Sequence, residues 1–234
     1  DLPVSAFAGY EDGVMDMGLT AYEKRGIATR VPVWDPEKCI QCNRCSYVCP
    51  HAVIRPYLLN EEEQTSRPEG MKTATAKGKQ AAGLFFSMQI SEADCTGCGS
   101  CMNVCPAKEK ALTMVPITQA EDSSASWEYA LNLTDKGDLF DPYTVKGSQF
   151  RQPLLEFSAA CAGCGETPYA KLLTQLYGDR MYWANATGCS QAWGAAMPGI
   201  PYTVNKAGQG PAWTNSLFEN NAEFALGISL SAEL

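Results

Sequence analysis

The chain has 234 residues, with 18 basic and 26 acidic side chains, so its formal net charge is −8. This length predicts one or two domains, and 45% hydrophobic with 10% aromatic residues excludes a chain that is disordered as a whole. The acidic balance excludes a protein that follows nucleic-acid phosphates with a basic stripe, so we expect no nucleic acid as a partner.

Eleven cysteines are the unusual feature of the composition, and an odd number cannot all pair in disulfides within the chain. The chain begins Asp1-Leu2-Pro3 without a secretory signal pattern, so we expect a cytoplasmic protein with metal-binding cysteines. The longest uncharged run, residues 181–205, contains Asn, Thr, Ser, Gln and two prolines. We therefore predict no membrane helix there and no membrane as a partner.

In chain order, residues 1–30 are expected to be the tail of a preceding domain or a linker. Residues 31–120 are expected to form an α+β, ferredoxin-like domain, because one cysteine pattern occurs in them twice. The two copies are Cys39-Ile-Gln-Cys42-Asn-Arg-Cys45-Ser-Tyr-Val-Cys49-Pro50 and Cys95-Thr-Gly-Cys98-Gly-Ser-Cys101-Met-Asn-Val-Cys105-Pro106. Strand-like stretches precede the copies at residues 31–34 and 84–90 and follow them at residues 53–54 and 111–115.

Three cysteines at positions i, i+3 and i+6 of a loop can all point at one cube of iron and sulfide. In two-cluster ferredoxins the fourth cysteine, followed by proline, ligates the other cluster. Carried onto this chain, the pattern predicts two 4Fe–4S clusters, one held by Cys39, Cys42, Cys45 and Cys105 and the other by Cys95, Cys98, Cys101 and Cys49. The weaker alternatives are structural zinc, which three consecutive CxxC steps would crowd, and disulfides, which need an oxidising compartment.

His51, the single histidine, follows Pro50. It could tune a neighbouring cluster through a hydrogen bond, although an inert packing role is the favoured interpretation. A single histidine excludes Rieske ligation, which needs two.

The remaining segments differ in character from the cysteine copies. Residues 60–83 are rich in charged and small residues and predict a solvated insertion. Residues 121–153 are polar and are expected to be a connector, followed by a second domain at residues 154–234. Between residues 181 and 218 the only charged residue is Lys206, which predicts burial against another domain or around a cofactor.

Three cysteines lie in this second domain: Cys161 and Cys164 in a CAGCGE turn, and Cys189 in an ATGCS stretch. Alone they are compatible with a third iron–sulfur cluster, an incomplete zinc site or a redox dithiol. Electron transfer uses chains of closely spaced centres, so their place after two clusters favours a third cluster.

A helix is predicted directly after the CAGCGE turn, with Thr167 as N-cap, Pro168 at the first helical position and Gly178 as the C-terminal stop. Four residues recur at helical spacing and predict its buried face: Tyr169, Leu172, Leu173 and Leu176. The free amides at the start of the helix would stabilise thiolates or a diphosphate in the turn.

Taken together, these motifs resemble the pyruvate:ferredoxin oxidoreductases, a family of thiamine-dependent 2-oxoacid oxidoreductases. The resemblance runs the whole length of the chain. The stretches that carry it are Leu2-Pro-Val-Ser-Ala-Phe7, Tyr22-Glu-Lys-Arg-Gly-Ile-Ala28, Cys39-Ile-Gln-Cys-Asn43, Cys49-Pro-His-Ala52, Asp94-Cys-Thr-Gly-Cys98, Ala160-Cys-Ala-Gly-Cys-Gly-Glu-Thr-Pro-Tyr169, Ala184-Asn-Ala-Thr-Gly-Cys-Ser190 and Gly210-Pro-Ala-Trp-Thr-Asn-Ser-Leu-Phe218.

The resemblance implies that residues 154–234 are the N-terminal part of an α/β thiamine diphosphate-binding domain. It implies a third 4Fe–4S cluster held by Cys161, Cys164, Cys189 and a cysteine much later in the chain. It also implies that Glu166 and the Cys189 region contact thiamine diphosphate, which binds with Mg²⁺ in the complete enzyme. The sequence lacks the pyruvate-activating N-terminal domain, the Mg²⁺–diphosphate motif and the fourth cysteine, so we expect an internal fragment that is inactive alone and contains no catalytic residue.

The resemblance further implies an enzyme that oxidatively decarboxylates pyruvate to acetyl-CoA and CO₂, with coenzyme A as acceptor of the two-carbon product. Electrons would pass through three 4Fe–4S clusters to ferredoxin or flavodoxin, and we expect a homodimer. The alternative is a freestanding two-cluster, ferredoxin-type electron carrier. Such a carrier would have no use for the CAGCGETPY and ATGCS motifs, so these motifs favour the enzyme.

Overall fold

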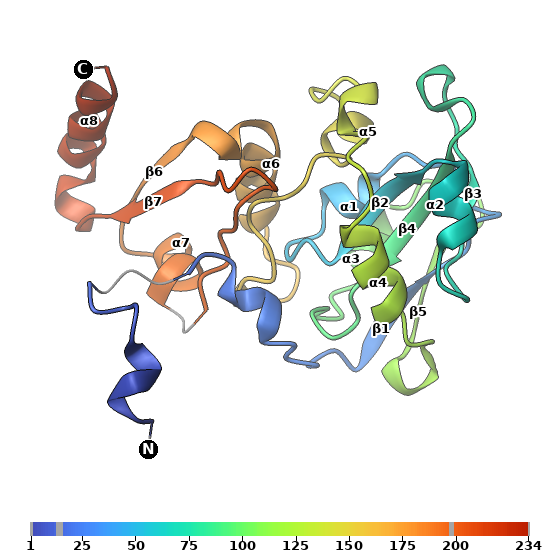
Figure 1. The fold of residues 1–234 in the computed structure, drawn as a ribbon, viewed down its shortest axis with the longest axis horizontal. Coiled ribbons are helices and arrows are strands. Elements are labelled where there is room, and N and C mark those ends of the chain that lie inside the picture. The colour runs from blue at the N-terminus through green and yellow to red at the C-terminus, as the bar shows by residue number, and fades with distance from the viewer. Residues whose placement is uncertain (1, 13–15, 197–198, 234) are drawn as a thin grey trace.

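Two small antiparallel sheets form the first of two lobes in the computed structural model, which describes residues 2–12, 16–196 and 199–233 (Figure 1). One sheet pairs β1 (Arg30–Trp34) with β5 (Leu112–Pro116), and the other has the order β2 (Ile54–Leu59), β4 (Phe85–Ile90), β3 (Ala74–Thr75). Pro32 lies opposite Met114, and Pro56 lies opposite Met88. Both prolines are in edge strands, where the missing N–H does not interrupt a ladder.

All four strands predicted for this lobe are present, and three of them lie within one residue of the predicted bounds. The exception is β2, which continues to Leu59 although only residues 53–54 were predicted. The hydrophobic pattern did not predict the second half of this strand because Arg55 and Pro56 interrupt the apolar run. Arg55 is nevertheless buried, since its guanidinium forms an ion pair with Glu156.

The cysteine copies are each followed by a short helix, α1 (Arg44–Tyr47) and α3 (Ser100–Val104), and these two helices pack against each other. The predicted insertion contains α2 (Glu61–Ser66), which begins with a capping box formed by Asn60 and Glu63. The predicted connector contains α4 (Ser124–Leu131) and α5 (Val145–Ser148). The repeated unit of strand, loop, helix and strand is thus observed twice.

The core of the first lobe lies between the two sheets and the predicted connector. The rings of Trp34 and Phe86 meet edge to face at 5.8 Å. Trp127 of α4 and Phe140 are buried in the same cluster, although they come from residues 121–153. The connector is therefore a packed part of this lobe.

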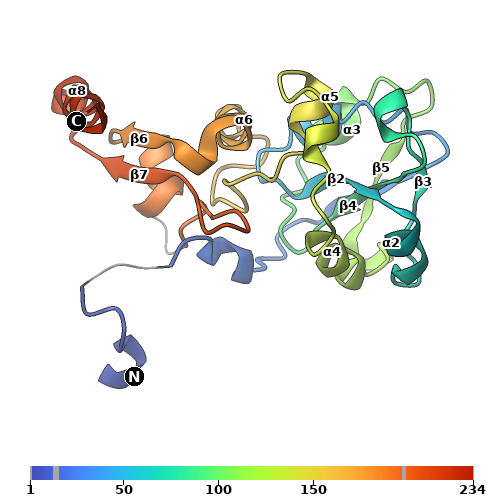
Figure 2. The same cartoon turned by 45° about the horizontal axis from the view of Figure 1, so that its top comes forward.

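The second lobe contains a parallel pair of strands, β6 (Tyr182–Asn185) and β7 (Ala212–Asn215), with helices on either side (Figure 2). The helices are α6 (Thr167–Tyr177), α7 (Cys189–Gln191), which continues as a π-helical turn at Ala192–Ala196, and α8 (Asn221–Ala232). Within the described ranges, no helix has both the length and the apolar character that crossing a membrane requires.

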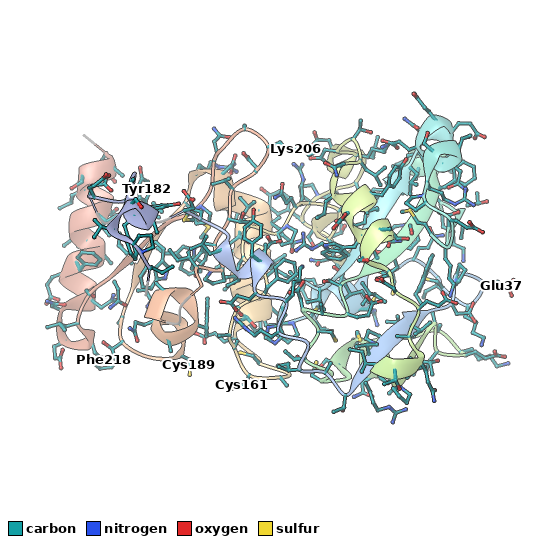
Figure 3. All side chains as sticks on the ribbon, turned by 60° about the horizontal axis from the view of Figure 1, so that its bottom comes forward. Glu37, Cys161, Tyr182, Cys189, Lys206 and Phe218 are labelled. Atoms are coloured by element: carbon teal, nitrogen blue, oxygen red, sulfur yellow. The ribbon has the colours of Figure 1, made fainter. Side chains whose placement is uncertain are left out.

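The uncharged segment is partly exposed in this chain, with Tyr182 63% and Phe218 75% exposed (Figure 3), so its burial against another domain or a cofactor stays a prediction. One sequence prediction for this lobe is wrong, the buried face of α6. The buried residues of α6 are Thr167, Ala170, Lys171, Thr174 and Gln175, rather than its tyrosine and leucines. The helix starts one residue earlier than predicted, with Glu166 as N-cap, and it packs its polar side onto the first lobe.

Polar contacts join the two lobes and the N-terminal segment. The guanidinium of Arg55 in β2 pairs with the carboxylate of Glu156, and both side chains are nearly buried. The Glu156 carbonyl oxygen accepts a hydrogen bond of 2.8 Å from the hydroxyl of Thr20. Gly18 donates its N–H to the Tyr202 carbonyl at 2.7 Å, so this segment lies against the second lobe.

Candidate iron–sulfur sites

The two cysteine loops of the first lobe have the same backbone conformation. The third residue of each CxxC step is left-handed, with φ of 59° at Gln41 and 69° at Gly97. The residue after the second cysteine is also left-handed, with φ of 59° at Asn43 and 76° at Gly99. This repetition shows that the sequence repeat is also a repeat of local structure, because each left-handed residue turns the chain tightly around the same space.

Each loop also directs a backbone amide at its first sulfur. The N–H of Gln41 donates to Sγ of Cys39 at 3.3 Å, and the N–H of Gly97 donates to Sγ of Cys95 at 3.4 Å. Amides aimed at sulfur stabilise the anionic thiolate, and hydrogen bonds to sulfur help to set the potential of an iron–sulfur cluster. The loops are therefore built for deprotonated cysteines.

The predicted insertion holds the first loop in this conformation. The side-chain amide of Gln41 donates to the Thr75 carbonyl at 2.9 Å and accepts from the Lys77 N–H at 2.7 Å. Asn43 donates to the Lys146 carbonyl at 2.9 Å. These bonds offset the strain of left-handed residues that carry a side chain. The sequence reasoning missed both anchors, although aligning the two copies places Gln41 and Asn43 opposite glycines.

The structure brings Cys49 beside the cysteines of the second loop. Burial, together with the nearby charge of Cys49, raises the pKa of the Cys101 thiol to about 12. Burial also raises the pKa of Cys95 to about 11, with Cys49 again contributing. Cys49 follows α1, which packs against α3, so it reaches the second loop across the pair of short helices. This is the arrangement that crossed ligation requires.

The first cysteine loop also contains a buried thiol, that of Cys45. The pKa of Cys45 is raised, mainly by burial and also by the charges of Cys101, Cys39 and Cys42. Cys105 is half-buried at the end of α3, and its carbonyl accepts a 2.5 Å hydrogen bond from the Lys110 ammonium. Thiols with raised pKa values in a buried cluster need a metal to bind them as thiolates.

A single metal ion does not suit these cysteines. Among the residues that the structure describes, no three His, Cys, Asp or Glu side chains are placed to hold one ion. Four thiolates on one zinc would lie about 3.8 Å apart, since Zn–S bonds are about 2.3 Å and tetrahedral. A cube of iron and sulfide accepts a wider spacing because each cysteine binds a different iron.

The CAGCGE turn repeats the features of the first two loops. Gly163, the third residue of its CxxC step, is left-handed with φ of 72°. The N–H of Glu166 donates to Sγ of Cys164 at 3.4 Å. A methyl group placed on Gly163 would lie 3.6 Å from Cβ of Cys98, so this turn touches the second cysteine loop.

Glu166 connects the turn to the segment that carries Cys189. Its carboxylate accepts a 3.2 Å hydrogen bond from the indole N–H of Trp193, which lies just after α7. In Figure 3, the labelled Cys161 and Cys189 lie at the same edge of the second lobe. Both are exposed, and Cys164 is half-buried. The three cysteines thus belong to segments that the structure ties together.

His51 lies between the cysteine loops of the two lobes. Its ring is buried, and Nδ1 is 3.1 Å from the Ser158 carbonyl oxygen. Burial lowers the pKa of His51, which favours the neutral ring. The ring thus packs next to the segment that leads to Cys161, and its buried Nε2 has no hydrogen-bond partner among the described residues, so both interpretations of this histidine stay predictions.

Comparison with known proteins supports iron–sulfur binding in the first lobe. A family model described as a 4Fe-4S dicluster domain matches residues 38–109, and a domain of unknown function matches residues 1–28. "Pyruvate-flavodoxin oxidoreductase" of Enterobacter agglomerans is 58% identical over 232 residues, and "Pyruvate:ferredoxin oxidoreductase" of Moorella thermoacetica is 60% identical over 232 residues. Each match covers 99% of this chain and 20% of the relative.

A third relative, "Pyruvate dehydrogenase [NADP(+)]" of Cryptosporidium parvum, is 55% identical over 230 residues, which are 97% of this chain and 12% of that protein. The chain thus spans one fifth or less of the length of these relatives. The resemblance that the sequence motifs predict is confirmed by these matches.

Proposed function

We propose that this chain, a homologue of one segment of the pyruvate-flavodoxin and pyruvate:ferredoxin oxidoreductases, is the electron-transfer and partial cofactor-binding segment of such an enzyme. The whole protein would oxidatively decarboxylate pyruvate to acetyl-CoA and CO₂ and reduce ferredoxin or flavodoxin. The dicluster family match over residues 38–109 supports the electron-transfer part. We further propose a cytoplasmic homodimer.

Three 4Fe–4S clusters are proposed. The crossed sets of four cysteines in the first lobe hold two of them, and Cys161, Cys164, Cys189 and a cysteine outside this chain hold the third. The observation that carries this proposal is the left-handed turn at Gln41, Gly97 and Gly163, the third residue of each CxxC step. Disulfides and a redox dithiol do not require this shared conformation.

Residues 154–234 are proposed to begin a thiamine diphosphate-binding domain, in which Glu166 and the Cys189 region contact the cofactor. Thiamine diphosphate with Mg²⁺ would stabilise the carbanion left by decarboxylation, and the clusters would accept its electrons singly. The start of α6 supports this assignment, because the positive end of its dipole directly follows the CAGCGE turn and favours anionic groups. Glu166 is exposed and already held by Trp193, which fixes its carboxylate near the turn.

Two contacts within this chain support an order for the electron path. Because the Gly163 turn touches the second cysteine loop at Cys98, the third site lies next to the cluster assigned to that loop. The packing of α1 on α3 then brings the two first-lobe sites together. The path runs from the second lobe through the second loop to the first loop, and from there to the external carrier.

The test is a count of iron and of cluster signals in the full-length protein. We expect about twelve iron atoms per chain for three clusters, and about eight after Cys161→Ser and Cys164→Ser together. Stoichiometric zinc in place of iron would overturn the cluster proposal. An unchanged iron count in the double variant would overturn the assignment of the third site to these cysteines, and a wild-type count of about eight would favour the two-cluster carrier.

A further inference from the structure

A buried lysine from the second lobe lies against the first cysteine loop. Lys171 is in the middle of α6 and is 2% exposed, although lysine is among the residues least often buried. Its ammonium donates hydrogen bonds to the carbonyl oxygens of Ser46, Tyr47 (3.3 Å) and Cys49 (3.1 Å). These carbonyls end α1 and lead to Cys49, so Lys171 caps the C-terminal end of that helix.

Lys171 forms no ion pair with a carboxylate among the residues that the structure describes. Burying an ammonium without a counter-charge is costly. Arg55 does not offset this cost either, since it is a cation that pairs with Glu156. The contacts of Lys171 instead lie beside two proposed cluster ligands, Cys45, which directly precedes Ser46, and Cys49 itself.

Two other lysines also contact ligand carbonyls, but from the surface. Lys77 donates to the Cys39 carbonyl at 2.8 Å, and Lys110 donates to the Cys105 carbonyl. Both side chains are exposed, so water and salt screen their charges. Only Lys171, of these three, places its charge in the interior.

We propose that Lys171 raises the reduction potentials of both ferredoxin-type clusters by holding one positive charge between their ligands. The inference rests on the proposed function, because Cys45 and Cys49 belong to different clusters only under crossed ligation. Each cluster gains one electron on reduction and becomes more negative, so a buried cation stabilises the reduced form. The effect is large in the interior because the low dielectric weakens screening.

Two features of Lys171 agree with this role. Its three carbonyl acceptors match the three N–H donors of an ammonium, so the geometry favours the charged form. It also comes from α6, the helix that starts at the third cysteine turn. A charge carried by this helix makes the first-lobe clusters better acceptors for electrons arriving from the second lobe.

The experiment compares full-length enzymes with Lys171→Gln, Lys171→Met, Lys171→Arg and Lys110→Gln. Iron content is measured first, and the midpoint potential of each cluster then follows from redox titration monitored by electron paramagnetic resonance. In both neutral Lys171 variants we expect the equilibrium constants for reducing both first-lobe clusters to fall at least tenfold, which equals about 59 mV for one electron. Lys171→Arg should stay within a few-fold of the wild type, and Lys110→Gln should have a smaller effect because its charge is solvated.

Wild-type potentials in the neutral variants would overturn the inference, as would an equal fall in Lys171→Arg. Loss of iron from both neutral variants would make Lys171 structural and would also overturn it. A wild-type enzyme without the two clusters would instead refute the proposed function itself. The two failures are therefore distinguishable.

Discussion

Gly97 and Gly99 allow the geometry of the second cysteine loop to be tested with a matched pair of substitutions. Both residues are left-handed, with φ of 69° and 76°, and alanine in that region costs about 1–2 kcal/mol. At Gly97, a methyl group would also lie 2.9 Å from the carbonyl oxygen of Arg30 and 3.4 Å from Cβ of Ala28. At Gly99 it would meet no atom within 4 Å.

The contact at Gly97 cannot be relieved by a side-chain rotation. The clashing atom belongs to the backbone of β1, and Arg30 is paired with Pro116 in the sheet. Overpacking of this kind costs about 1–3 kcal/mol. We therefore expect Gly97→Ala to destabilise the loop by about 2–5 kcal/mol, and Gly99→Ala by about 1–2 kcal/mol.

The assay heats each full-length variant stepwise with an iron chelator and follows the cluster signals by electron paramagnetic resonance. Gly97→Ala should lose the signal of the second-loop cluster at a lower temperature than Gly99→Ala, while the first-loop cluster persists in both. Equal behaviour of the two variants would refute the steric argument. Parallel loss of both clusters would contradict the assignment of Gly97 to one loop.

Three further predictions follow from contacts in the first lobe. Cys49→Ser should remove the cluster of the second loop and leave that of the first, and spectroscopic loss of the first-loop cluster instead would contradict crossed ligation. Glu156→Gln leaves Arg55 as a buried unpaired charge and should lower the free energy of unfolding by about 3–5 kcal/mol; a change below about 1 kcal/mol in chemical denaturation would show that the pair is solvated. Gln41→Ala removes two hydrogen bonds and should lower the free energy of unfolding by about 1–3 kcal/mol. Iron should then leave the first loop faster than the second, and an unchanged rate of release would show that the insertion does not anchor the first loop.

The cysteine spacing and the flanking strands could be predicted because both depend on local pattern. Four strands of the fold are read directly from short apolar runs between turn residues. The length of β2 could not be predicted from the sequence, because a charged Arg55 interrupts the apolar run. Its burial depends on an ion pair with Glu156, which is 101 residues away in the chain. The hydrogen bonds of Gln41 to residues 75–77 could not be predicted either, because the polar sequence of the insertion does not indicate which loop it contacts.

The reversed face of α6 shows where hydrophobic periodicity fails as a guide. A periodic leucine face predicts the buried side of a helix only when the partner surface is apolar. Here the partner is the carbonyl end of α1, which needs hydrogen-bond donors, and Lys171 supplies three bonds to it. Tyr169 and Leu173 are left outward, 71% and 40% exposed, and Leu172 and Leu176 are only half-buried. The polar side of α6 is thus its packing side, because much of the surface it covers consists of polar groups that need hydrogen-bond partners.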